Sequence, residues 1–505
     1  MGYAIQLAII YFLTPYVLQQ IGDTRYGIWV IVVSITGYYG LLDLGLRAGL
    51  TQYITRYFAA GDWSRMNSAA SSGLALQWCC AVCVLLFTFA SAAFAENLFA
   101  FPSGLALEAR WCILVVGCST SIQFLLFPFS VALTAAQRFD IVTATSLISR
   151  ISSAVATVGC LTAGFGLIGL CVAGALGNVL DYLLRWGIGS RIVPELKFSL
   201  KFVNWQSCRE CLGFGLWSAL LAASALLISF SDALVIGLFM PVSAVVFFAL
   251  ANNVIRYVAH LFVPFNQVFF PAATALDARN DVAGLQRLYL TGSRLLTLLV
   301  LSVALIATVW ADDFYSTWVG AKYLDDSLYH SVPLLFRILL IGTVCAAMQG
   351  IGSKVLLGRR KIGGLAKLFI CEGFLNLTIS LLLIHQYGLL GVALGTMLPA
   401  IVFQGILHPI MVCRELGLSF SVYSRNILWP AIRVGVVLAP LLIFVHHFTT
   451  SPGPLVLLLV GVGSTLLAAI VISVLGLTMS DRQRYVYPLI LRSLESSRFA
   501  SETKL

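Results

Sequence analysis

Long apolar runs constrain this chain more than any other feature. About fourteen runs, each close to the roughly 20 residues that an α-helix needs to cross a bilayer, are separated by short polar connections. Only 10% of the residues are charged, against roughly 25% in a soluble domain, whose surface must face water. The sequence therefore predicts an all-α polytopic membrane protein and excludes soluble enzymes. We expect the spans at 3–20, 28–52, 69–95, 111–134, 141–163, 167–188, 212–238, 243–270, 289–310, 333–356, 363–384, 388–412, 428–447 and 454–477.

The distribution of basic residues predicts the orientation in the membrane. The chain carries 31 Lys and Arg against 21 Asp and Glu. The loops on one side hold only Arg25, Arg110 and Lys322, whereas the alternate loops and the C-terminal tail hold most of the other basic residues outside the spans. Positive residues accumulate on the cytoplasmic side of a membrane. We therefore expect both termini in the cytoplasm, an even number of spans, and membrane lipids rather than nucleic acid beside this charge.

A faint internal repeat predicts two lobes. The block Arg56–Asp62 follows the second span and the block Ala278–Asp281 follows the eighth, about 220 residues apart, as expected for parallel repeats in a transporter. We expect two six-helix lobes related by a pseudo-twofold axis, with the substrate path between them near the membrane midplane. The predicted boundaries are an N-terminal lobe at 1–188, a cytoplasmic linker at 189–210, a C-terminal lobe at 211–412, helices 13 and 14 within 413–477, and a basic cytoplasmic tail at 478–505.

Arginines inside the spans need a reason, because a charge at the bilayer centre costs about 2.5–3.5 kcal/mol on insertion scales. Arg47 follows Asp43 by four residues and Arg256 precedes His260 by four, so each pair shares one helix face. Arg150 and Arg337 have no obvious local carboxylate. Because the guanidinium fork matches phosphate oxygens, we predict a cationic cavity for a pyrophosphate and its sugars. The predicted lining is Arg47, Arg150, Arg256, Arg337, Tyr39, Asn253 and His260; for Arg47, a neutralised internal ion pair remains the alternative.

Carboxylates inside the spans suggest a second role. Asp43, Asp232 and Glu372 could each exchange a proton or bind Na⁺ and so couple transport to an ion gradient. Each could equally be the counter-ion of a neighbouring arginine. No other cofactor and no metal site are expected. The sequence has no P-loop, G-x-S-x-G or H-E-x-x-H motif in a suitable context, so we expect no catalytic residues, no ATP hydrolysis and no enzyme.

The first 60 residues contain several blocks that resemble those of a known family, namely Pro15, Ile21–Gly22, Tyr26–Trp29, Leu42–Leu46 and Ala60–Asp62. The chain resembles the polysaccharide transporter family, the Wzx-type flippases of lipid-linked oligosaccharides, which belong with MATE-type multidrug exporters and peptidoglycan precursor flippases in one exporter superfamily. The layout is similar over most of the chain, although only the Leu42–Leu46 block is carried over by position, and Arg150, Arg256 and Arg337 rest on the charge argument.

The resemblance implies two six-helix lobes in a V, a central cationic cavity and alternating access. It also implies that undecaprenyl-pyrophosphate-linked oligosaccharide moves from the cytoplasmic to the periplasmic leaflet of a bacterial inner membrane. The implied context is surface-polysaccharide assembly, whether O-antigen, capsule or exopolysaccharide, alongside a glycan polymerase and other synthesis proteins. Family members are thought to draw on ion gradients.

Two other functions remain open. An ion-coupled drug or cation antiporter of the MATE type should have a cavity richer in carboxylates than in arginines. A membrane glycan polymerase or ligase usually needs sizeable periplasmic loops, and the longest outside loop here, 311–332, has only about 20 residues. A purely structural scaffold would leave the costly arginines without a purpose. The flippase is therefore our first hypothesis.

Overall fold

The computed structural model describes residues 2–43, 45–99, 101–102, 104–325, 329–449 and 453–477. Nearly all of these residues are helical, and this part of the chain contains no β-strand. The prediction of an all-α polytopic membrane fold is therefore confirmed. The predicted basic tail, 478–505, lies outside the described residues.

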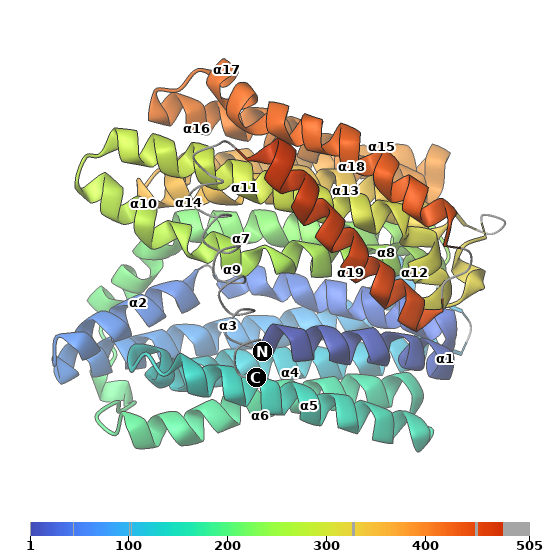
Figure 1. Cartoon of the computed structure of the whole chain (residues 1–505). Coiled ribbons are helices and arrows are strands. Elements are labelled where there is room, and N and C mark those ends of the chain that lie inside the picture. The colour runs from blue at the N-terminus through green and yellow to red at the C-terminus, as the bar shows by residue number, and fades with distance from the viewer. Residues whose placement is uncertain are drawn as a thin grey trace, which may run out of the picture. The chain divides into compact units, whose positions relative to one another are not determined.

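The elements follow one another along the chain as helices joined by short connections (Figure 1). Elements η1 to η3 are 3₁₀-helices, whereas η4 to η6 are π-helices, which carry extra residues in their turns. In chain order they are α1 (Gly2–Gly37), η1 (Tyr38–Asp43), α2 (Leu46–Ala59), α3 (Trp63–Leu98), α4 (Ala106–Ala135), α5 (Phe139–Thr162), α6 (Gly166–Ile192), η2 (Leu200–Phe202), α7 (Trp205–Phe239), α8 (Ala244–Leu261), α9 (Val263–Gln267), α10 (Phe269–Ala278), α11 (Val282–Val309), α12 (Ala311–Trp318), η3 (Ala321–Tyr323), α13 (Val332–Met348), α14 (Gly350–Gly358), α15 (Ile362–Ala400), η4 (Ile401–Leu407), α16 (His408–Leu416), α17 (Phe420–Tyr423), η5 (Ser424–Leu428), α18 (Trp429–His447), α19 (Pro454–Val471) and η6 (Ile472–Gly476).

Among the described residues, 12 helical stretches are long and apolar enough to cross a membrane. Two of them have a glycine with a positive, non-helical φ in their interior, namely Gly22 at 75° in α1 and Gly388 at 54° in α15. The stretch Ile362–Leu416 has 55 residues, which at 1.5 Å per residue is about 80 Å, far more than a hydrocarbon core of about 30 Å. Gly388 therefore divides it into two spans and Gly22 divides the first stretch likewise, which agrees with the fourteen predicted spans.

The described chain forms two compact units. The first contains Met1–Asn253, Asp325–Leu335 and Ile362–Pro399. One of its apolar clusters joins α2, α3 and α4 through Leu50, Ile54, Met66, Ala70 and Val131, and Gly73 leaves the space that Leu50 fills. This packing fixes α2 against its neighbours, so the polar residues at the start of α2 have a defined position.

The second unit contains Val254–Leu324, Phe336–Lys361 and Ala400–Leu505. One of its apolar clusters joins α11, α18 and α19, so helices 13 and 14 of the prediction pack on the ninth span. The cluster consists of Leu298, Ala431, Val434, Leu438, Leu442, Ala468 and Val471. The predicted lobe boundaries stay a prediction.

Candidate functional site

Arg47 lies at the start of α2, where Gly45 in the left-handed conformation (φ 74°) ends the preceding 3₁₀-helix. Asp43 sits on the other side of this break. Its Oδ1 lies 3.3 Å from Arg47 Nε and accepts a hydrogen bond of 2.9 Å from Gln77 Nε2. Its Oδ2 accepts the backbone N–H of Arg47 at 3.3 Å. Asp43 is therefore the counter-ion of Arg47 and also caps α2.

Two aromatic rings hold the same guanidinium. The Arg47 Cζ atom lies 4.4 Å from the ring centre of Phe124 and 4.9 Å from that of Phe127, both on α4. A cation over aromatic faces is attracted by the ring quadrupoles. The Arg47 side chain is 29% exposed. Arg47 thus combines a structural attachment to α4 with partial access for a ligand.

Arg150 lines a polar cavity of about 280 Å³ in the first unit. The cavity lies between the first half of α1, α5 and α6. Arg150 has no hydrogen bond or ion pair with any residue that the structure describes. The cavity lining is Gln6, Ile9, Ile10, Leu13, Ser146, Ser149, Arg150, Ser153, Ala154, Gly174, Gly177, Asn178 and Asp181.

The one carboxylate of this cavity is already neutralised. Asp181 forms a 2.7 Å ion pair with Arg185 one turn away, and Arg185 also donates to Ser146 Oγ at 2.6 Å. The buried Ser149 Oγ has no hydrogen-bond partner. The cavity therefore offers one uncommitted positive charge together with hydroxyl and amide groups, a set that suits a phosphate and sugar hydroxyls.

Tyr39 and Asn253 are held by other protein groups. Tyr39 is buried in an apolar cluster with Val84 and Phe124, and its hydroxyl lies 3.4 Å from Ser91 Oγ. Asn253 Nδ2 donates to the Tyr26 hydroxyl at 3.4 Å. Apolar packing and a hydrogen bond hold the Tyr39 side chain, and a hydrogen bond to another helix holds the Asn253 side chain.

Arg256 and His260 lie on α8 in the second unit, and both are exposed. Their four-residue spacing places them on one side of the helix, as predicted. The sequence analysis predicted one cationic cavity lined by Arg47, Arg150, Arg256 and Arg337. That shared cavity stays a prediction.

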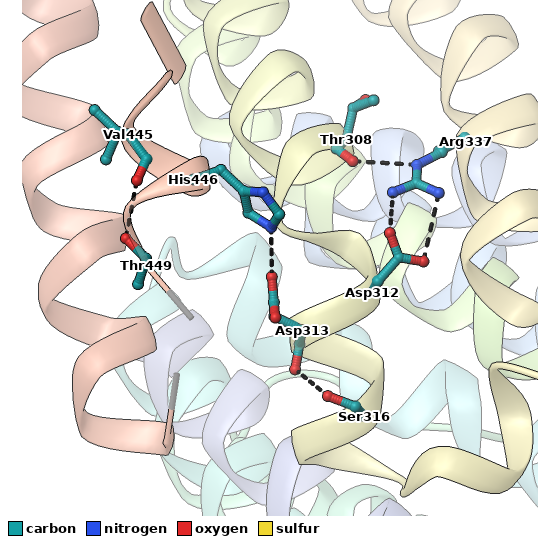
Figure 2. A network of polar contacts seen from close by, with 8 residues as sticks. All are labelled: Thr308, Asp312, Asp313, Ser316, Arg337, Val445, His446 and Thr449. Carbon is teal, nitrogen blue, oxygen red and sulfur yellow. Dashed lines mark hydrogen bonds and ion pairs between the residues drawn. The ribbon is translucent and has the colours of Figure 1, made fainter. Parts of the chain in front are cut away.

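Arg337 has a carboxylate partner that sequence spacing does not reveal. Figure 2 shows its guanidinium against both carboxylate oxygens of Asp312 on α12, while Arg337 Nε donates to the Thr308 carbonyl at 3.2 Å. The expectation of an arginine without a local carboxylate is therefore wrong at this position. The neighbouring Asp313 carboxylate lies 2.8 Å from His446 Nε2, so the first turn of α12 contacts both α13 and α18 (Figure 2). Arg337 thus acts as a connection between helix ends.

Asp232 is the buried carboxylate with neutral surroundings. It lies on α7 and is 4% exposed. Thr396 Oγ1 donates to its Oδ2 at 2.9 Å, Asn376 Nδ2 donates to that hydroxyl at 3.0 Å, and Ser231 Oγ donates to Asn376 Oδ1 at 3.3 Å. Asp232 Oδ1 has no hydrogen-bond partner. No basic side chain in the described part of the chain forms an ion pair with it.

The three predicted ion-coupling residues therefore differ. The Asp43 carboxylate is paired with Arg47, whereas Asp232 Oδ1 has no hydrogen-bond partner and could accept a proton or a cation. Glu372 lies on α15 and is 5% exposed. Among the described residues, no group of three or more His, Cys, Asp and Glu side chains could hold a metal ion.

Sequence reasoning missed the neutral polar partners. Gln77, Asn178, Asn376 and Thr396 position or accompany the charged groups, and Gln6 joins the lining of the cavity. These residues could have been found in the sequence, because an amide side chain within an apolar span needs a hydrogen-bond partner, as a charged side chain does.

Comparison with known proteins identifies the family and the fold. A model of a polysaccharide biosynthesis protein family matches residues 23–327, more than half of the chain. The uncharacterized membrane protein EpsK of Bacillus subtilis (strain 168) is 22% identical over 424 residues, which cover 83% of this chain and 82% of EpsK.

Two solved structures share the fold. The lipid II flippase MurJ in an inward closed conformation has a TM-score of 0.69 and 14% identity, covering 92% of this chain and 97% of that chain. An inward-facing multidrug resistance MATE family transporter of the MOP superfamily has a TM-score of 0.65 and 17% identity, covering 81% and 95%. These similarities agree with the family resemblance that the first 60 residues predicted. The chain is thus a multi-pass membrane protein that belongs to the polysaccharide biosynthesis protein family.

Proposed function

We propose that this protein is a flippase that translocates undecaprenyl-pyrophosphate-linked oligosaccharide from the cytoplasmic to the periplasmic leaflet by alternating access. Its family and its MurJ-like fold support a transporter of this type. The single observation that carries the substrate class is the uncommitted Arg150 in a polar cavity.

The cavity suits the head of such a substrate. Arg150 would hold the pyrophosphate, and Ser149 and Asn178 would meet the first sugar. A volume of about 280 Å³ lies just below the usual range of ligand pockets, which is about 300–1,000 Å³. It accommodates the charged head and a sugar rather than a whole oligosaccharide. The lipid tail would stay in the bilayer, so that only the polar part needs the protein.

The coupling ion would bind at Asp232. Its free Oδ1, together with the hydroxyl and amide oxygens of Thr396, Ser231 and Asn376, gives a buried oxygen site for Na⁺ or a proton. Neutralising the carboxylate would remove the cost of a buried charge. Ion binding would therefore favour conformations in which this site is closed to water.

We also propose the cellular setting. Both termini would lie in the cytoplasm and the protein in a bacterial inner membrane, and the distribution of basic residues over the loops supports this orientation. The flippase would act in surface-polysaccharide assembly, beside a glycan polymerase and other synthesis proteins.

Reconstitution of the full chain in proteoliposomes tests the proposal. A fluorescent polyprenyl-pyrophosphate-linked sugar is placed in the outer leaflet, and its movement is followed by loss of accessibility to a membrane-impermeant quencher. We expect transport of this lipid and much slower transport of a neutral polyprenyl-linked sugar that lacks phosphate. Extrusion of a cationic dye without movement of either lipid would support a drug antiporter instead. Movement of both lipids at equal rates would show that phosphate is not recognised.

A further inference from the structure

The twelfth predicted span changes from one compact unit to the other at a π-helix. The first unit ends at Pro399 and the second resumes at Ala400. The π-helix η4 begins directly afterward, at Ile401, and α16 follows it from His408. A π-helical segment has a looser backbone geometry than an α-helix and often marks a functional position. This position is therefore where the span can bend at low cost.

His408, the first residue after η4, is completely buried and bonded to neutral groups. Its Nδ1 lies 3.2 Å from Gln349 Oε1, and its Nε2 lies 3.3 Å from Ser353 Oγ. Gln349 Nε2 in turn donates to the Tyr423 hydroxyl at 3.1 Å. Because Gln349 Oε1 can only accept, His408 Nδ1 carries the proton in this arrangement and Ser353 donates to Nε2. We call these four side chains the His408 cluster.

Three of the four cluster residues lie at or beside an irregular backbone segment, beginning with His408 directly after η4, whereas Ser353 lies within α14. Gln349 lies between α13 and α14 with φ −90° and ψ 4°, outside the helical range. Tyr423 is the last residue of α17, immediately before the π-helix η5. The tenth and twelfth predicted spans, and the helical stretch Phe420–His447 that leads into the thirteenth, thus all have an irregular segment beside the same hydrogen-bonded group. Such interruptions are tolerated at membrane depth only where protein encloses them.

Close packing joins the cluster to α11. A Cβ atom at Gly352 would lie 3.1 Å from His408 Cε1 and 3.3 Å from Tyr289 Cε2. The Tyr289 and Tyr423 rings stack with centroids 6.1 Å apart and planes at 18°. The buried Tyr289 hydroxyl itself has no hydrogen-bond partner. Tyr289 therefore contributes packing, whereas Tyr423 contributes both packing and a hydrogen bond.

We infer that the His408 cluster, whose four residues all belong to the second unit, is a joint at which three helical stretches bend together, with η4 as its movable segment. The hydrogen bonds would couple the three irregular segments, so that when one helical stretch bends the other two bend with it. Thr396, the partner of Asp232, lies on the same helix shortly before η4. The link from ion binding to this joint rests on the proposed function, whereas the joint itself does not.

Hydrogen–deuterium exchange on the full-length protein in nanodiscs tests the joint without any substrate. Tyr423→Phe removes the hydroxyl that Gln349 contacts, and Ser353→Ala removes the contact with His408 Nε2. Tyr289→Phe is the matched control, because it removes an unbonded hydroxyl from the same ring stack. A neutral hydrogen bond corresponds to about a fivefold change in an opening equilibrium. We therefore expect amide exchange to rise about fivefold in 349–353, 401–407 and 424–428 together in both test variants, and to stay unchanged in the control.

Two results would overturn the inference. Faster exchange confined to the helix that carries the substitution would mean that the three interruptions are independent. An equal effect of Tyr289→Phe would mean that ring packing alone matters. The link to ion binding has its own readout, in which Na⁺ at constant pH, or a lower pH after division by the intrinsic exchange rate, slows exchange in 401–407 of the parent but not of Asp232→Asn. Identical responses in the two proteins would refute that link.

Discussion

Replacement of Arg150 by glutamine gives the sharpest test of the cavity. Glutamine keeps a polar, hydrogen-bonding side chain but removes the positive charge. Arg150 is exposed and bonds to no residue in the described part of the chain. We therefore expect the free energy of unfolding to change by less than about 0.5 kcal/mol, as for surface substitutions that break no contact.

The expected effect on transport is much larger. A hydrogen bond to a charged group contributes about 1.5–3 kcal/mol, and each 1.4 kcal/mol is a factor of ten. Loss of the charge-assisted contact to pyrophosphate should therefore lower the initial rate at subsaturating substrate by about 10-fold to 150-fold. Arg150→Lys should recover part of this rate, because lysine keeps the charge but not the fork.

The assay is the proteoliposome measurement with polyprenyl-pyrophosphate-linked sugar, at several substrate concentrations and with the thermal unfolding midpoint measured on the same preparations. Arg191→Gln is the matched control. It removes an equal charge from the end of α6, at an exposed position outside the cavity lining. We expect it to transport at the parent rate.

The reasoning would be refuted by normal transport in Arg150→Gln at all substrate concentrations. It would also fail if Arg150→Gln and Arg191→Gln slowed transport equally, since net charge rather than the cavity would then be responsible. A lowered unfolding midpoint in Arg150→Gln would show that Arg150 has a structural partner.

Three further predictions follow from particular contacts. Asp232→Asn should fold normally but lose the dependence of transport on an imposed Na⁺ or proton gradient, and an unchanged gradient dependence would argue against the coupling site. Arg47→Lys keeps the charge but loses the flat contact with Phe124, so unfolding measurements should show a loss of about 1–2 kcal/mol; an unaltered stability would mean that the ring contacts are unimportant. Gly395→Ala would place Cβ 2.2 Å from Ser380 Oγ and 2.7 Å from its backbone N, so the protein should lose about 1–3 kcal/mol of stability or fail to fold, and a stable variant would contradict this packing.

The sequence alone was sufficient for features that depend on near neighbours in the chain. Spans can be found because the length of an apolar run is a local property that must match the bilayer. The pairing of Asp43 with Arg47 was also accessible, because the two residues are close in sequence, although the structure brings them together across the break at Gly45 rather than along one continuous helix. The family resemblance came from a short block of the first 60 residues, and the comparisons agree with it.

The tertiary structure decided which charges are free and which are committed. Arg150 and Arg337 looked alike in sequence, yet Arg337 meets Asp312 across a loop, whereas Arg150 opens into a cavity. Asp232 depends on Thr396, a residue 164 positions away. Helix periodicity says which side chains share a face but not which face of another helix lies opposite. That choice is made when whole helices pack, so the partners of distant polar groups could be known only from the folded chain.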